Sequence, residues 1–216
     1  MANVVTRQIL VDGPRNVVVK LAGILDTADL MPTGAAITTG SLTTTVGSRT
    51  VTYTAAGAGP VVGQYVTFSD GTTTFPAGTY IRSILSSTSC ILSNAALTAV
   101  TTVVMTAVVG VAVALDPAEL STLNGQSTGP VATRLIIDKI SYNVEALSGV
   151  NLYWEATAND LITTLVSSGD DIDMKDYGGI YNTEKAGVTG KIVYTTQGWV
   201  ASSVLSYDII IECRKK

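Results

Sequence analysis

The sequence predicts an all-β protein, in which a jelly-roll-like β-sandwich frame carries a second, small β-sandwich or barrel domain as an insertion. Two observations predict the fold class. Between Arg134 and Arg214, apolar and polar residues alternate with a period of two, as on strands that bury one face. The composition agrees, since only 14% of residues are charged and about one residue in seven is threonine, which is common on sheet surfaces.

A third observation divides the chain. Over residues 32–110 the only charged residues are Arg49, Asp70 and Arg82, whereas charges are frequent on both sides of this block. A block so different from its flanks is interpreted as a domain inserted into a loop of the outer one. The sequence therefore predicts a frame made of residues 1–31 and 111–216, and an inserted module made of residues 32–110.

The frame opens with a predicted hairpin. Its strands are Val4 to Asp12 and Val17 to Leu25, two β-branched runs separated by a turn that contains glycine and proline. After the module, frame strands are predicted over residues 110–115, 131–145, 150–156, 190–196 and 205–214, with a less regular segment around residues 161–174. The total is about eight, the number that a jelly roll needs. Asp116, with proline and glutamate soon after it, predicts one short helix.

The module contains five short β-rich runs separated by glycine, proline and asparagine turns. They cover residues 50–54, 65–68, 79–84, 89–92 and 101–107. Short strands at such regular spacing predict a small sandwich or barrel. One alternative is a membrane span over Ala95 to Leu115, which is uncharged and long enough to cross a bilayer. Its threonines, its valines and the turn offered by Gly110 favour strands instead.

The charges and the absence of histidine exclude several classes of function. With a net charge of -4 and a pI near 4.7, the chain lacks the basic surface of a nucleic-acid binder. The absence of histidine removes the commonest nitrogen ligand of zinc and the usual catalytic base, so neither a metal nor another cofactor is expected. Gly125 to Gly129 matches G-x-S-x-G, but it lies in a polar loop before a strand, so we expect no enzyme.

The cysteines and the amino-terminal segment suggest where the chain is made. Cys90 and Cys213 fall in different segments and are interpreted as two buried apolar side chains, although a disulfide between them stays open. The first residues lack the basic and then apolar pattern of a secretory signal. We therefore expect a cytoplasmic protein that has no contact with membranes.

The candidate sites are partner contacts, and no catalytic, cofactor-binding or metal-binding residue is predicted. The candidates are Asp170, Asp171, Asp173, Asp176 and Trp199. The four aspartates lie within seven residues, in a predicted loop between strands. Calcium binds such clusters, but the EF-hand spacing is missing, so solvated loop carboxylates or an acidic patch that meets a basic partner fit better. Trp199 follows a Gln-Gly pair in a loop, where an exposed tryptophan marks a contact.

The other aromatic residues have two interpretations. Trp154 and Tyr142 share the apolar parity of Leu152 and Ile140, which predicts that they lie in the core and form no sugar platform. Five aromatic residues of the module suggest a second hypothesis, that the module binds host glycans. They are Tyr53, Tyr65, Phe68, Phe75 and Tyr80.

Several segments together carry a resemblance to known proteins. In the frame they are Ile9 to Gly23 (ILVDGPRNVVVKLAG), Arg134 to Ala156, Asp173 to Ile180, Gly187 to Thr196 and Ser206 to Lys215. They look like the small structural proteins of tailed bacteriophages. The module segment Gly63 to Thr98 resembles the threonine-rich β modules of phage capsid decorations and tail fibres.

The resemblance implies a virion protein without catalytic residues. The expected role is a capsid decoration or cement protein that binds the major capsid protein and stabilises the head, as a homotrimer assembled in the host cytoplasm. Two alternatives stay open: a neck, tail or baseplate component, and a host-recognition protein that binds glycans. Low charge and abundant β-branched residues suit a protein that is selected for stability.

Overall fold

A computed structural model describes residues 4–25, 37–54, 61–126, 128–145, 149–166, 169–182, 186–197 and 205–216. It divides the chain into two compact units, which we call the frame and the module. The frame is Met1–Leu30 with Ala114–Lys216, and the module is Met31–Val113. The described elements are almost entirely strands, and the two helical segments are single 3-10 turns of three residues each. The predicted all-β class is confirmed.

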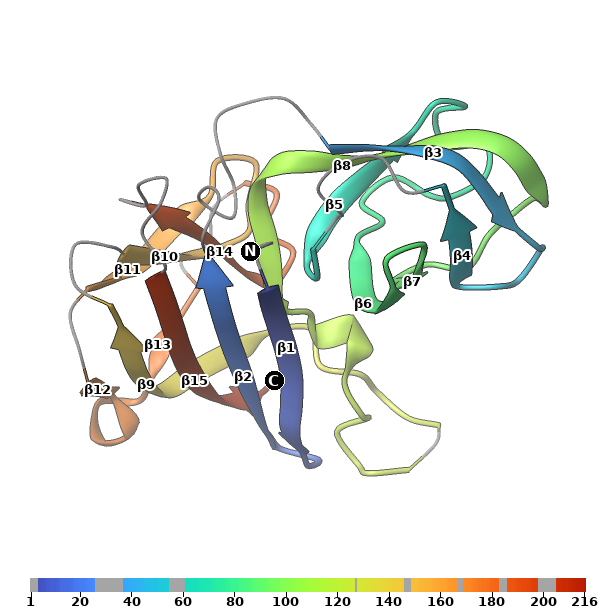
Figure 1. Cartoon of the computed structure of the whole chain (residues 1–216). Coiled ribbons are helices and arrows are strands. Elements are labelled where there is room, and N and C mark those ends of the chain that lie inside the picture. The colour runs from blue at the N-terminus through green and yellow to red at the C-terminus, as the bar shows by residue number, and fades with distance from the viewer. Residues whose placement is uncertain are drawn as a thin grey trace. The chain divides into compact units, whose positions relative to one another are not determined.

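The first sheet of the frame is antiparallel. Its strands are β1 (Val4–Asp12), β2 (Asn16–Leu25), β9 (Leu135–Val144), β12 (Asp170–Asp173), β13 (Ile180–Tyr181) and β15 (Leu205–Lys215). They follow the order β1-β2-β15-β9-β12, and β13 also pairs with β9 (Figure 1). The predicted opening hairpin is confirmed as the pair of β1 and β2. We call the side of this sheet that faces away from the frame core the outer face.

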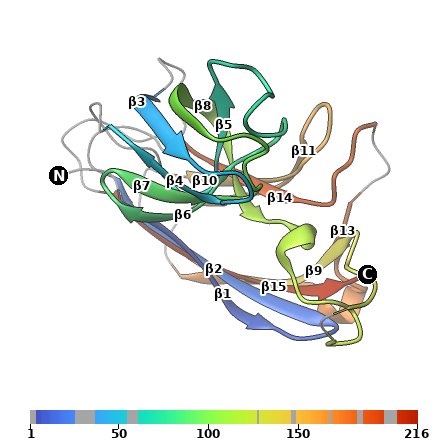
Figure 2. The ribbon, with the colours of Figure 1, turned by 90° about the vertical axis from the view of Figure 1, so that its right-hand side faces the viewer.

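The second sheet of the frame contains β10 (Gly149–Trp154), β11 (Asp160–Val166), β14 (Ile192–Gln197) and the end of β8 (Val100–Leu115). Its order is β11-β10-β14-β8. The turned view shows β10 and β14 in one layer and β1, β2 and β15 in the other (Figure 2). The last two residues of β8, Ala114 and Leu115, belong to the frame.

The connections between these strands are those of a jelly roll. Without β1 and β13, the frame strands in chain order are β2, β8, β9, β10, β11, β12, β14 and β15. One sheet takes the first, eighth, third and sixth of them, and the other takes the second, seventh, fourth and fifth. This order is the double Greek key of jelly rolls. The module occurs in the connection between the first and the second of these strands.

The frame core lies between its two sheets because the inward positions are apolar. In β2, Val17, Val19 and Leu21 are fully buried, and the residues between them are partly exposed. Trp154 is 2% exposed, which confirms its predicted place in the core. Tyr142 is only partly buried, contrary to expectation, since it lies on β9 directly opposite the edge strand β12.

A buried ion pair ties β1 to the segment after β8. The side chains of Arg7 and Glu119 are 5% and 7% exposed and pair with each other. Arg7 Nε also donates to the Ala114 carbonyl oxygen over 2.8 Å. Glu119 ends the turn η1 (Pro117–Glu119), in which Asp116 Oδ1 accepts a hydrogen bond from the Ala118 N–H over 2.9 Å. The predicted cap is present, but the helix is one 3-10 turn.

The module has its own apolar core. Its strands are β3 (Ile37–Thr44), β4 (Thr50–Tyr53), β5 (Gln64–Phe68), β6 (Ile81–Ser86), β7 (Ser89–Leu92) and the first part of β8. Both β3 and β5 pair with β8, and β3 continues through β4 and β7 to β6. One buried cluster contains Leu42, Val51, Leu92 and Met105, with the stacked rings of Phe68 and Phe75. All members of this cluster belong to the module.

The apolar stretch that suggested a membrane span forms an extended strand. Residues Val100–Leu115 are β8, as the threonines and valines of this segment favour. Among the described residues, no helix has the length and apolar character that crossing a membrane requires.

Candidate functional site

The acidic run forms an edge strand and not the predicted loop. Asp170–Asp173 is β12, which pairs antiparallel with β9, so that Asp170 lies opposite Tyr142 and Asp173 opposite Lys139. Aspartate disfavours strands, and local sequence therefore predicted a loop. The hydrogen bonds that β9 offers outweigh this preference, and charged side chains on a short edge strand also hinder pairing with other chains.

Two lysines of the outer face form ion pairs, one with Asp171 of the acidic run and one with Asp208 of β15. Lys139 Nζ lies 2.8 Å from Asp171 Oδ2, and Lys20 Nζ lies 2.6 Å from Asp208 Oδ2. Both pairs join neighbouring strands diagonally, which long side chains can reach. Hydrogen bonds from Lys139, and then from Ser141, hold the pKa of Asp171 below its ordinary value. Asp171 is therefore ionised and held in place at neutral pH.

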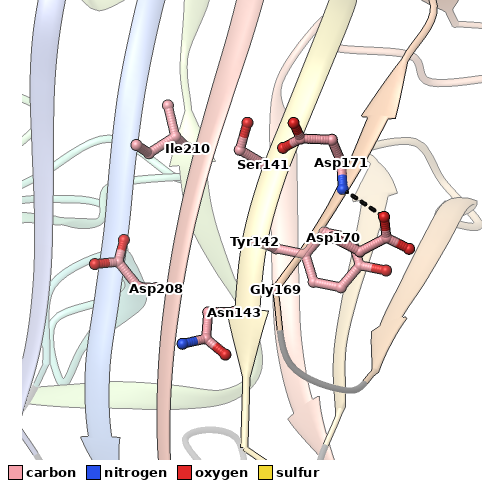
Figure 3. Close-up of a pocket in the computed structure, with 8 residues that line it drawn as sticks. All are labelled: Ser141, Tyr142, Asn143, Gly169, Asp170, Asp171, Asp208 and Ile210. Carbon is pink, nitrogen blue, oxygen red and sulfur yellow. Dashed lines mark hydrogen bonds between the residues drawn. The ribbon is translucent and has the colours of Figure 1, made fainter.

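A shallow hollow of about 500 Å³ opens on this face at the end of β12. Eight residues line it: Ser141, Tyr142, Asn143, Gly169, Asp170, Asp171, Asp208 and Ile210. Figure 3 shows Ser141 and Asn143 on β9, Asp208 and Ile210 on β15, and the two aspartates on β12. The Asp171 N–H donates to Asp170 Oδ1 over 2.8 Å, which orients the first carboxylate.

A second hollow, of about 330 Å³, continues the first toward β1. The two share Asn143 and Asp208, and the second also contains Thr6, Ala22 and Ser206. The register places Thr6 opposite Ala22, Ala22 opposite Asp208, and Asp208 opposite Asn143, in one row across four strands. The side chains in that row are small, and the second hollow is the space above them. We call the two hollows together the outer groove.

The remaining predicted contacts lie elsewhere. Asp176 is in the turn η2 (Lys175–Tyr177), and it does not line the outer groove. Trp199 lies outside the described residues. Asp170 and Asp171 both line the first hollow, and Asp171 and Asp173 share the outward face of β12, opposite Ser141 and Lys139.

Sequence reasoning missed two exposed tyrosines beside β12. Tyr177 and Tyr181 are 80% and 65% exposed. The loop that carries Tyr177 is held firmly, since Arg214 donates to Asp138 and to the Gly178 carbonyl oxygen. For Tyr177, the available signal in the sequence was its position directly before a pair of glycines.

The aromatic residues of the module are not available to a glycan. Four of the five, namely Tyr53, Phe68, Phe75 and Tyr80, are at most 8% exposed, and Tyr65 is partly buried with its ring edge-on to Tyr80. Tyr53 and Phe68 occupy inward positions of β4 and β5, whereas Phe75 and Tyr80 are buried outside the strands. This finding removes the observation on which the hypothesis of a glycan site in the module depended.

Cysteine and metal chemistry adds no further site. Cys90 and Cys213 are free and buried, as interpreted from the sequence, and burial raises the pKa of the Cys90 thiol to about 12. In the part of the chain that the structure describes, no group of three or more cysteine, aspartate or glutamate side chains is placed to hold a metal ion.

Comparisons with known proteins identify no relative. No protein-family model, no curated protein and no solved structure matches this chain.

Proposed function

We propose that this chain is a structural protein of a bacteriophage virion, a capsid decoration or cement protein that binds the major capsid protein and stabilises the head. One observation carries the proposal: the frame sheet ends in a short edge strand with three aspartates, Asp170, Asp171 and Asp173. Copies of the chain repel one another along this edge, whereas a basic surface attracts it. A protein that must stay dispersed and then coat a shell needs both properties.

The rest of the frame supports the proposal. Jelly rolls are recurrent building blocks of viral capsids, and this frame has their connectivity. Fold alone does not imply function, so this connectivity and the resemblance of the frame segments to phage structural proteins only support what the edge strand carries. In this proposal, the partner that binds along β12 is a basic surface of the major capsid protein.

The test replaces Asp170, Asp171 and Asp173 by asparagine and measures attachment to undecorated heads. We expect weaker attachment at low salt and a difference that disappears at high salt, since ions screen exposed charges. A matched control, Glu145→Gln with Asp160→Asn and Glu212→Gln, removes three carboxylates of the frame outside β12 and should attach like the wild type. Equal attachment of the β12 variant at low salt would show that β12 makes no electrostatic contact.

Copy number separates the decoration role from the alternatives. Several hundred copies per virion are expected of a protein that coats the capsid, whereas neck, tail and baseplate proteins occur in small multiples of three or six. Quantitative mass spectrometry of purified virions gives this number. The proposed homotrimer is an assembly that cyclic symmetry closes. It is tested separately, by measuring the molar mass of the purified protein with light scattering.

A further inference from the structure

The outer groove, which runs across the face of the frame sheet, has the chemistry of a carbohydrate site. It offers carboxylates that only accept hydrogen bonds, lysines beside them that only donate, and an amide and hydroxyls that do both. A sugar hydroxyl donates and accepts at the same time. Paired Asp and Lys side chains such as Asp208 and Lys20 satisfy both halves of such a group.

Apolar groups in the groove suit the other part of a sugar. Ile210 lies between Lys20 and Ser141 in the cross-strand register, and Ala22 lies beside Asp208. These side chains present aliphatic surface to the C–H groups of a pyranose ring. Polar groups fixed around an apolar floor are the usual composition of a small-molecule site.

The charge of the groove favours a neutral ligand over a basic peptide. Three carboxylates line it, Asp170, Asp171 and Asp208, and two lysine ammonium groups lie within 2.8 Å of the last two. The three carboxylates carry a charge of -3 and the two ammonium groups a charge of +2, so the net charge of the five groups is -1. The attraction for a polycation is therefore weaker than three unpaired carboxylates would give, while every hydrogen-bonding group stays in place.

From these observations we infer that the outer groove binds a neutral oligosaccharide. The inference goes beyond the proposed attachment to a capsid, because the groove extends from β12 across β9, β15 and β2 to β1, far from the edge, and Asp173 of the edge strand lies outside its lining. Asn143 and Asp208, which both hollows share, hold the centre of the ligand. The long axis of the oligosaccharide lies across the strands.

The experiment applies the full chain to a printed array of neutral, acidic and amino oligosaccharides and measures the affinity for the best neutral probe. Asn143 is exposed on β9, so that Asn143→Trp fills the centre of the groove without entering the core. Asp208→Asn removes the central carboxylate charge. We expect each variant to bind at least roughly tenfold more weakly than the wild type. Gln8→Trp adds the same ring to the exposed face of β1, outside the groove, and should bind like the wild type.

Two results would overturn the inference. One is wild-type binding at background level on every neutral probe, and the other is an Asn143→Trp variant that binds as well as the wild type. If the first result comes with salt-sensitive binding of an oligolysine peptide, the groove is a peptide site instead. Attachment of the same variants to undecorated heads is measured in parallel, so that failure of the glycan site and failure of the capsid contact are distinguished.

Discussion

Tyr207 of β15 lies directly opposite Gly23 of β2, and its ring occupies the space that a side chain on Gly23 would need. Tyr207 is 4% exposed and cannot move outward without opening the frame core. The pair explains why glycine interrupts a mainly apolar strand, since glycine in a strand often marks a close approach of another group.

Gly23→Ala should therefore destabilise the frame. Overpacking of this kind costs about 1–3 kcal/mol. The measurement is urea unfolding followed by tryptophan fluorescence, because both tryptophans of the chain belong to the frame. The neighbouring Ala22 faces outward, and Ala22→Ser is a control that should leave the midpoint unchanged. Adding Tyr207→Leu to Gly23→Ala should recover part of the loss, and no recovery would assign the effect to something other than the ring.

A second prediction concerns the buried lysine at the end of β15. The Lys215 side chain is fully buried; its ammonium pairs with Asp12 and donates to the Ser121 carbonyl oxygen over 3.1 Å. Lys215→Met removes the buried ammonium that both acceptors share and should cost about 2–4 kcal/mol. Lys20→Met breaks a more exposed pair with Asp208 and should cost about 0–1 kcal/mol. Equal losses in urea unfolding would contradict the assigned difference in burial.

The third prediction is the acid sensitivity that Asp12 creates. Burial raises the pKa of Asp12, but the hydrogen bonds from Lys215 and Ser121 outweigh burial and hold it below the ordinary value of 3.8. A lowered pKa in the folded state means that the contribution to stability is present above pH 3.8 and is lost as the pH falls through the folded value. Asp12→Asn should lose stability near neutral pH and show a shallower decline in acid. A parallel pair of pH profiles would refute this assignment.

A fourth prediction tests whether the frame folds without the module. Since the apolar cluster of the module contains residues of the module alone, joining Leu30 to Ala114 by a short glycine-serine linker should leave the frame folded. Cooperative loss of tryptophan fluorescence on heating is the expected result. In the full chain, Cys90 reports the module and Cys213 the frame, because each thiol is buried in one unit and reacts only when that unit opens. A deletion variant that is already unfolded at low temperature would show that the frame and the module share a core.

The sequence by itself determined the all-β class, the opening hairpin and the buried place of Trp154. These features depend on alternation and turn residues, which are local properties of the chain. Alternation predicted the two faces of β15 correctly because Tyr207, Ile209, Ile211 and Cys213 are all buried against the frame core. The same local signals failed for Asp170–Asp173, where charge and low strand propensity predicted a loop.

Tertiary structure alone decided which residues share a surface. Ala22, Asn143 and Asp208 are far apart in sequence and meet in one row only through the register of β2, β15 and β9. A shift of register by one residue would turn these side chains to the opposite face, and no local pattern specifies which pairing occurs. The strand β12 has the same origin, since its hydrogen-bond partner β9 begins 35 residues before it along the chain. Long-range pairing, which the hydrogen bonds and the common core select together, thus created both the acidic edge and the outer groove.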